Sequence, residues 1–278
     1  MVGLVPTATD DVGETPLSDV AAALRTLGAG IGRGGDRLGA VVEAHGLHEV
    51  LSAELVAALA TYVRGRARAK AARAALTAAA APPAPYVVLE VGAGDGALGG
   101  HLASAVAADA ALGDPPITVT VTDSLAHTAV GGGPRDRLPD AAFPVEPAEQ
   151  GSAVAAAAPD LVIASWMPAG VDWTAGWRAA GVGEYLLLGE ADDGCCGCAW
   201  RTWGNPAAAP MASGKAGWWG AGAEGAPSSP PTAPYRVDGY TRVALGGVSR
   251  WMISRFDAPG VRNAAAVAFR RGGGSGAG

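Results

Sequence analysis

The stretch YVVLEVGAGDGALGGHLA, residues 86–103, decides how this chain folds. It opens with apolar, largely β-branched residues that predict a strand, and residues 97–107 carry apolar side chains at helical spacing. Between them lies a turn with glycines at alternate positions, Gly92, Gly94 and Gly96. Glycine permits positive φ and lets a ligand approach the backbone closely. The stretch therefore predicts a strand–turn–helix corner that can hold a ligand.

The alternation of strands and helices continues along the chain. Further strands are predicted at 117–124, 159–166 and 183–192, with a weaker one within 141–149, where two prolines argue against a strand. Helices are predicted at 153–158 and 173–181. Apolar strands that alternate with helices predict an α/β fold with an open, Rossmann-like, doubly wound and mainly parallel sheet.

An antiparallel pair of strands is predicted at the C-terminal end of the sheet. The segments YTRVAL (240–245) and SRWMISRF (249–256) both have the composition of strands and are joined by a short GGV connection. The segment RRGGGSGAG (270–278) has the composition of a tail.

Helical material precedes the first strand. Ser18 predicts the start of a short helix, and a longer helix is predicted from Ser52, with one apolar stripe of Leu55, Leu59, Tyr62 and Val63. The expected organisation is then as follows: a loose tail at 1–16, a helical cap at 17–81, a main domain at 82–271 and a flexible tail at 272–278. Within the main domain, the Gly/Pro/Trp-rich insertion at 194–234 is too long for an ordinary connection. It is expected to be a lid, an Ω-type loop or a partly disordered segment.

The charge of the chain gives little sign of a nucleic-acid partner. The formal net charge is −6, whereas a nucleic-acid binder normally shows a basic patch or stripe. The dense basic run is expected to be a solvated helix face and consists of Arg64, Arg66, Arg68, Lys70 and Arg73. The sequence shows neither a signal-peptide core nor an apolar run long enough for a membrane span. A cytoplasmic protein with no membrane partner is expected.

The glycine turn fits two classes of cofactor site. The pattern Gly92-x-Gly94-x-x-Ala97 satisfies the dinucleotide-binding fingerprint. The run Glu90-Val-Gly92-Ala-Gly94-Asp95-Gly96 resembles motif I of the class I S-adenosylmethionine-dependent methyltransferases. The acidic residue before the glycines, the helical cap and the terminal strand pair favour the methyltransferase resemblance. A tight turn that holds no ligand is the third alternative.

The resemblance implies the residues that hold S-adenosylmethionine. Asp123 ends the second strand, where the family places a carboxylate that accepts hydrogen bonds from the ribose hydroxyls; the alternative is a turn-forming aspartate. Glu146, after the weak third strand, is expected near the adenine. The full expected cofactor set is Glu90, Gly92, Ala93, Gly94, Gly96, Asp123, Glu146 and Ser165.

The resemblance also points to catalytic residues, and these are Ser165, Trp166 and Asp172. Ser165-Trp166-Met167-Pro168 lies where the family's fourth motif meets donor and acceptor, but it lacks the Asp or Asn of enzymes that methylate amino nitrogens. Aromatic faces can steady a sulfonium by cation–π attraction, a role for Trp166 and Trp173, with plain packing as the alternative. Candidate general bases at this edge are Asp172, Glu190, Asp192 and Asp193, unless the last three form a solvated loop.

The cysteines of GCCGC are Cys195, Cys196 and Cys198, and no histidine pattern completes a zinc site, so no metal is expected. The sequence therefore favours a methyltransferase that moves a methyl group by in-line displacement to an unidentified acceptor, with a small molecule or protein preferred. A catalytically inactive, methyltransferase-like interaction protein and an NAD(P)-dependent oxidoreductase are the alternatives.

Overall fold

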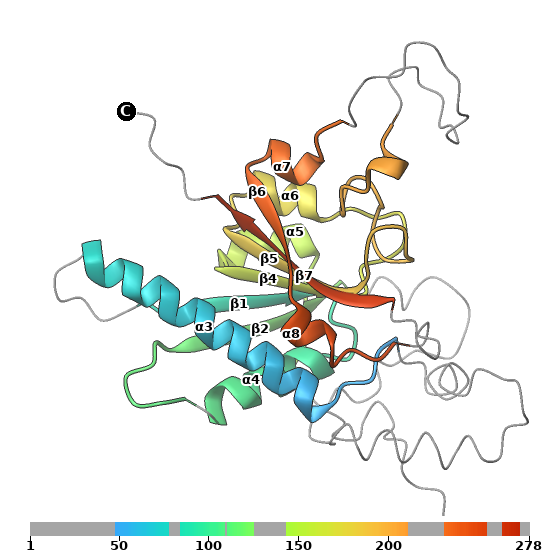
Figure 1. Cartoon of the computed structure of the whole chain (residues 1–278). Helices are drawn as coiled ribbons and strands as arrows, with labels where there is room; N and C mark the ends of the chain where they lie inside the picture. The colour runs from blue at the N-terminus through green and yellow to red at the C-terminus, as the bar shows by residue number, and fades with distance from the viewer. Residues whose placement is uncertain are drawn as a thin grey trace, which may run out of the picture.

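The computed structural model describes residues 48–77, 84–108, 110–124, 143–210, 231–254 and 263–272 (Figure 1). The expected tail at 1–16, the helix at Ser18 and residues 273–278 lie outside this part of the chain. Seven strands form one sheet in the order β3-β2-β1-β4-β5-β7-β6. Their bounds are β1 Tyr86–Val91, β2 Ile117–Asp123, β3 Glu146–Pro147, β4 Leu161–Ser165, β5 Glu184–Glu190, β6 Tyr240–Ala244 and β7 Ala264–Arg271. The helices are α3 Ala53–Thr77, α4 Ala97–Ala108, α5 Gln150–Ala157, α6 Thr174–Ala179, α7 Pro234–Val237 and α8 Gly246–Ser249, with a 3₁₀ turn η3 at Pro206–Ala208.

The sheet is parallel except at one end, as the sequence predicts. β1 pairs in parallel with both β2 and β4, and β5 continues the parallel part beyond β4. β7 lies antiparallel between β5 and β6. After β1 the chain moves outward to β2 and β3 and then returns to place β4 on the other side of β1. The carboxyl ends of β1 and β4 therefore form the point where the strand order reverses, which is where open α/β sheets bind ligands.

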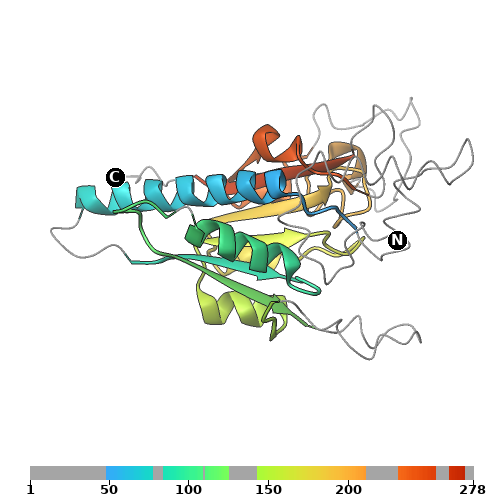
Figure 2. The ribbon, with the colours of Figure 1, turned by 90° about the horizontal axis from the view of Figure 1, so that it is seen from below.

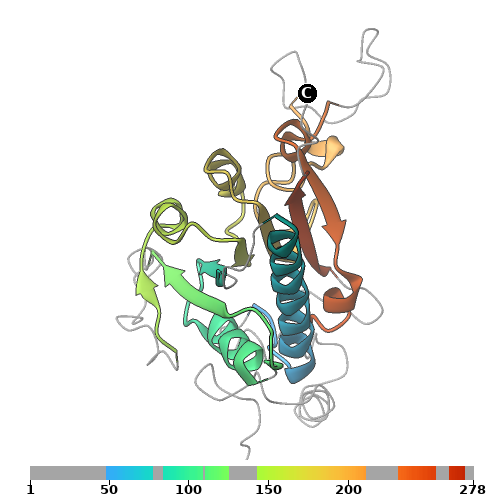
Figure 3. The same ribbon diagram turned by 90° about the vertical axis from the view of Figure 1, so that its left-hand side faces the viewer.

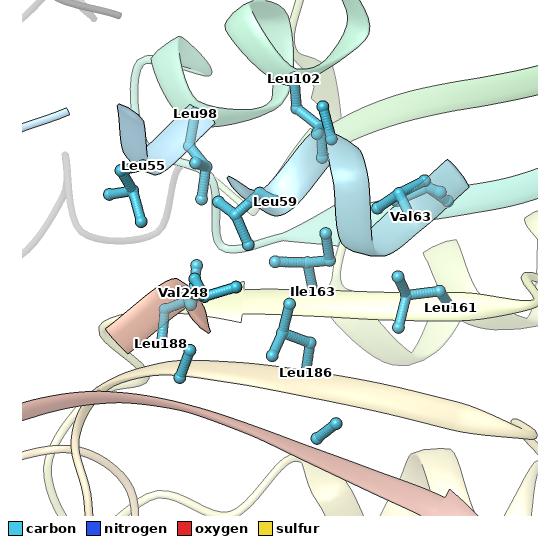
Figure 4. Packing of buried hydrophobic residues seen from close by; sticks show 14 of the residues in the cluster. Leu55, Leu59, Val63, Leu98, Leu102, Leu161, Ile163, Leu186, Leu188 and Val248 are labelled. Carbon is cyan, nitrogen blue, oxygen red and sulfur yellow. The ribbon is translucent and has the colours of Figure 1, made fainter. Parts of the chain in front are cut away.

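Helices cover both faces of this sheet. On one face, α3, α4 and α8 pack on the sheet, with Leu55, Leu98 and Val248 buried against strand residues such as Ile163 and Leu186 (Figure 4). The other face is covered by α5, α6 and α7 in a second buried cluster. Figure 2 shows α3 along one face with α5 on the opposite side, and Figure 3 shows α3 between α4 and the β6–β7 pair. Two buried layers on one sheet confirm the expected doubly wound architecture.

The antiparallel end of the sheet exists, but its second strand was predicted in the wrong place. Residues 246–249 form α8, and residues 250–254 are a turn and coil in which only Ser254 makes an isolated bridge. The strand is instead β7, which includes Arg270 and Arg271 of the expected tail. β7 is rich in alanine, a residue that is depleted in strands, and it is buried between β5 and β6. The strand propensity of its residues therefore did not predict β7.

The helix predicted from Ser52 is α3, and it is tied to the sheet by its basic side chains. The Ser52 hydroxyl accepts the Leu55 backbone N–H at 3.2 Å, as a helix cap does. Along the basic run, Arg66 pairs with Glu184, Arg68 with Asp114 at 2.7 Å and Lys70 with Asp160 at 2.6 Å. Arg68 and Lys70 stay exposed, as expected of a solvated face, whereas Arg66 is half-buried in its pair with Glu184, so the expectation is wrong for Arg66. No helix in the described part of the chain is both long and apolar enough to cross a bilayer.

Candidate functional site

The glycine turn after β1 has the conformation that only glycine adopts readily. Gly92, Gly94 and Gly96 have φ of +64°, +60° and +77°. A Cβ on Gly92 would lie 2.8 Å from the Trp173 ring, and one on Gly96 would lie 2.6 Å from Val145. Among the residues that the structure describes, a Cβ on Gly94 would meet nothing within 4 Å. Two of the glycines therefore allow close packing, whereas the third faces open space and leaves backbone accessible to a ligand.

Asp123 joins this turn to the neighbouring strand. It is the last residue of β2 and is buried, and its Oδ2 accepts the Gly94 N–H at 2.8 Å. The Ala93 N–H donates to the Thr122 carbonyl at 3.1 Å beside it. A carboxylate can accept several hydrogen bonds at once, so the contact with Gly94 does not exhaust its capacity. The predicted cofactor residues Ala93, Gly94 and Asp123 thus lie together.

Glu90 lies behind the turn rather than on it. Its side chain is buried against α4, where a Cβ on Gly99 would come within 2.3 Å of Oε2, and this oxygen has no hydrogen-bond partner. Burial, and then repulsion from Asp95 and Asp123, raises the pKa of Glu90 to about 8, although the Gly99 backbone partly opposes the shift. At neutral pH the carboxyl group is therefore largely protonated, and it supports the turn from the side of α4.

Glu146 and Ser165 flank the turn on either side. Glu146 is exposed in the two-residue strand β3, level with Thr122 of β2 and so beside Asp123. Ser165 is half-buried at the end of β4, and extension of the β1–β4 register places it level with Gly92. The structure thus brings all the predicted cofactor residues to one edge of the sheet.

The two tryptophans predicted for this edge are both half-buried there. Trp173 lies against Gly92 and 6.4 Å from Trp177 between ring centroids. Trp166 follows β4 directly, and its indole Nε1 donates to Oε2 of Glu49 at 3.2 Å. The His48 ring lies 5.7 Å from the Trp166 ring. His48 and Glu49 were missed by sequence reasoning, because nothing local marks two residues that are 117 or more positions away in the chain.

Asp172 has a structural role in the part of the chain described. Its Oδ1 accepts the backbone N–H of Thr174 at 3.1 Å and the Thr174 hydroxyl at 2.6 Å, which fixes the start of α6. The hydroxyl of Thr202 also donates to it at 3.2 Å. Its use as a general base stays a prediction.

The acidic run after β5 is mostly engaged in local contacts. Glu190 accepts the Cys195 backbone N–H at 3.0 Å, and Asp192 forms an ion pair with Arg242 at 3.0 Å. Asp193 is exposed. Glu190 and Asp192 therefore anchor the loop that follows β5.

The first part of the predicted insertion is packed rather than open. Trp203 is buried, and its indole N–H donates to the Cys196 carbonyl at 2.6 Å. Burial opposes ionisation of the Cys198 thiol, but hydrogen bonds from Arg201 and Trp200 outweigh it and lower its pKa. Residues 211–230, with the other two tryptophans of the insertion, lie outside the described residues. Among the residues that the structure describes, no histidine, cysteine and carboxylate group is arranged to hold a metal.

Two surface grooves lie on the α3 side of the molecule. One, of about 660 Å³, runs between α3 and α8, and the other, of about 350 Å³, runs between α3, α4 and the start of β2. Neither groove is lined by a residue of the glycine turn.

Comparisons with known proteins find a weak structural match and no match to a protein family. No protein-family model matches the chain, and neither does any curated protein. Among solved structures, the chain is similar to the structure of the citrinin polyketide synthase CMeT domain, with 18% identity and a TM-score of 0.29. The match covers 67% of this chain and 46% of that one, so it spans less than half the length of the solved chain. A likeness this distant carries no argument about activity.

Proposed function

We propose that this chain binds S-adenosylmethionine at the glycine turn and transfers its methyl group to an acceptor, as class I methyltransferases do. The observation that carries the proposal is the contact between Gly94 and Asp123. A positive-φ glycine with open space above it donates its N–H to a buried carboxylate at the end of the next strand. Accessible backbone thus lies beside a buried carboxylate next to the reversal point of the sheet, and the resemblance implies that this carboxylate binds the ribose.

The form of the sheet supports the same proposal. The resemblance in residues 90–96 implies a mainly parallel, seven-stranded sheet that ends in an antiparallel pair, and the observed sheet has this form. The helix α3 packs on the sheet where the resemblance implies an N-terminal cap. Both features come from parts of the chain distant from the motif.

The residues at this edge fit the cofactor. The backbone of Gly92, Ala93 and Gly94 would face it, and Asp123 would accept hydrogen bonds from its ribose, with Glu146 beside Asp123 on the adenine side. Ser165, level with Gly92, would face the methionine part. Glu90 would keep the turn in place from beneath, since its carboxyl group is buried.

The chemistry needed from the protein is modest. S-adenosylmethionine, when bound, supplies a methyl group on a sulfonium that an acceptor displaces in line. Alignment of two reactants can contribute about 7–11 kcal/mol to such a step. Trp173 lies against Gly92 of the turn and Trp166 directly follows β4 at the same edge of the sheet, and an aromatic face can steady a cation by about 0.5–2 kcal/mol. The main task of the protein in this reaction would thus be to align the two reactants and to keep water away from them.

A second candidate function is cofactor binding without catalysis. Asp172 and Asp192, two of the expected general bases, are engaged in a helix start and an ion pair. Ser165-Trp166-Met167-Pro168 lacks the amide or carboxylate that methylation of amino nitrogens commonly uses. An interaction protein that retains the fold but has lost catalysis would show both features.

Calorimetric titration with S-adenosylhomocysteine separates these functions from an oxidoreductase. The proposal expects saturable binding of S-adenosylhomocysteine and no binding of NADH or NADPH by the folded chain. Transfer of tritium from labelled S-adenosylmethionine into fractions of a cell extract then separates a methyltransferase from an inactive binder. Binding of NADH but not of S-adenosylhomocysteine would show that the turn serves the dinucleotide class.

A further inference from the structure

Trp166 has a backbone conformation that large side chains rarely adopt. Its φ is +55°, in the left-handed region, which costs about 1–2 kcal/mol for a residue with a Cβ. The other described non-glycine residues with positive φ are Ala158, which follows α5, and Asp192 in a turn. A bulky residue in this region directly after a strand of the site is a strained position, and strain of this kind clusters at functional sites.

Several contacts hold Trp166 in this conformation. Its backbone N–H donates to the Leu188 carbonyl of β5 at 2.8 Å. Its ring lies next to Gly189, where a Cβ would be 3.6 Å from it. The indole Nε1 donates to Oε2 of Glu49 at 3.2 Å, and the His48 ring lies 5.7 Å away. The contact with Glu49 is polar and directional, so it sets the orientation of the indole.

Glu49 reaches this position through its own anchored segment. Glu49 forms an isolated antiparallel bridge with Ser254, and the Val50 N–H donates to the Ile253 carbonyl at 2.8 Å. Its side chain is largely shielded, since the residue is 7% exposed. A carboxylate in such a place acts at lower dielectric than one in water, so its field on the neighbouring indole is strong.

Trp166 lies at the same edge of the sheet as the turn. It directly follows β4, which runs parallel to β1, so Trp166 and the turn both stand at the carboxyl ends of neighbouring strands. An indole attracts cations at its face because of its quadrupole, and a carboxylate that accepts its N–H adds negative charge to the same group. The pair therefore favours a positive charge at the carboxyl end of β4.

We propose that Glu49 is a positioning residue that makes Trp166 a charge-selective wall, which favours the sulfonium cation of S-adenosylmethionine over the neutral thioether of S-adenosylhomocysteine. This rests on the proposed function. The selectivity assists turnover, because the wall holds the charged donor more firmly than the uncharged product.

The test compares cofactor affinities and needs no methyl acceptor. Dissociation constants for S-adenosylmethionine, its ammonium analogue sinefungin and S-adenosylhomocysteine are measured by calorimetry in the wild type and in Glu49→Gln. Glutamine keeps an oxygen that can accept the indole N–H but removes the charge. We expect affinity for the two cationic ligands to fall about three- to tenfold while that for S-adenosylhomocysteine stays unchanged. Glu54→Gln, a nearby change in the first turn of α3, is the matched control and leaves all three affinities unchanged.

A second variant keeps the test decisive if Glu49→Gln does not fold. Trp166→Phe retains an aromatic face but has no N–H for Glu49, so it lowers the affinity ratio of cationic to neutral ligand in the same way. In the double variant the loss does not grow beyond that of Trp166→Phe, because without the indole N–H the side chain at position 49 has no contact through which to act. An unchanged ratio in the folded single variants overturns the role of Glu49. Failure of the folded wild type to bind any of the three ligands overturns the proposed function, and this inference with it.

Discussion

Two buried glutamates at opposite ends of the sheet have opposite surroundings. Glu184, the first residue of β5, accepts hydrogen bonds from the Tyr62 hydroxyl and from Nε of Arg66, and from Nε of Arg270 at 2.9 Å. Arg270 also donates to the Tyr62 hydroxyl at 3.1 Å. Glu90, near the end of β1, has a buried oxygen with no hydrogen-bond partner in the part of the chain that the structure describes. The first glutamate is fully compensated, whereas the second is not.

The difference separates a region that stabilises the fold from a region with the features of a binding site. At the amino end of β5, charge is neutralised inside a network that joins α3, β5 and β7. At the carboxyl end of β1 and β4, the chain contains positive-φ glycines, a strained tryptophan and an unpaired carboxyl oxygen. Such features reduce stability and persist where a ligand or reaction needs them. Each end therefore responds differently to substitution.

The largest effect is expected from breaking the Glu184 network. Glu184→Ala leaves Arg66, Arg270 and the Tyr62 hydroxyl without their shared partner, and loss of one member of a buried ion pair costs about 3–5 kcal/mol. Because both arginines are partly exposed, we expect a value near about 3 kcal/mol in urea unfolding. A loss no larger than that of an exposed control, Glu149→Gln, would show that the network adds no stability.

The second effect is a pH dependence carried by Glu90. Its folded-state pKa of about 8 lies above its ordinary value of 4.5, so between these values the folded protein keeps a proton that the unfolded chain releases. The free energy of unfolding therefore falls as pH rises through this window, by at most about 1.4 kcal/mol per pH unit from this group.

Glu90→Gln has no proton to lose at this position and is expected to flatten that dependence. The stability advantage of the variant over the wild type should therefore widen as the pH rises through this window. Urea unfolding at a series of pH values measures the difference. Parallel curves for wild type and variant would mean that Glu90 is ionised in the folded protein.

The third effect separates stability from binding at the glycine turn. Gly94 and Gly239 both have positive φ, +60° and +82°, and a Cβ on either would meet nothing within 4 Å. Alanine at either position should cost about 1–2 kcal/mol of stability, measured by thermal unfolding. Only Gly94→Ala should also weaken binding of S-adenosylhomocysteine, since only its Cβ would fill the space over the turn. Equal affinities in the two variants would mean that no ligand lies over Gly94.

The smallest effect is expected from the surface pair of Arg68 and Asp114. Hydrogen bonds from Arg68 and the Ala111 backbone lower the pKa of Asp114 to about 2, but the Arg68 side chain is 54% exposed, so salt screens the pair. Arg68→Gln should change the urea midpoint less than any variant above, and less still at high salt. A loss comparable to that of Glu184→Ala would show that α3 depends on this exposed pair.

The parts of the fold that could be predicted are those that depend on residues close together in the sequence. β1, the turn and α4 follow from one continuous pattern, and Asp123 could be found because it ends the next apolar strand. β7 was missed because its alanines are poor strand formers that the surrounding sheet overrides. The contact of Glu49 with Trp166 spans 117 positions and depends on how α3 is docked. No local pattern encodes such a contact.

The most direct measurement of the central claim compares the two ends of one strand. Asp123 ends β2 beside the turn, and Asp114 precedes β2 at the other edge of the sheet. In calorimetric titrations with S-adenosylhomocysteine, the wild type and Asp114→Asn should bind equally well, and Asp123→Asn should bind about ten- to a hundredfold more weakly. Absence of binding to the folded wild type, or equal binding by both variants, would contradict a cofactor site at the glycine turn.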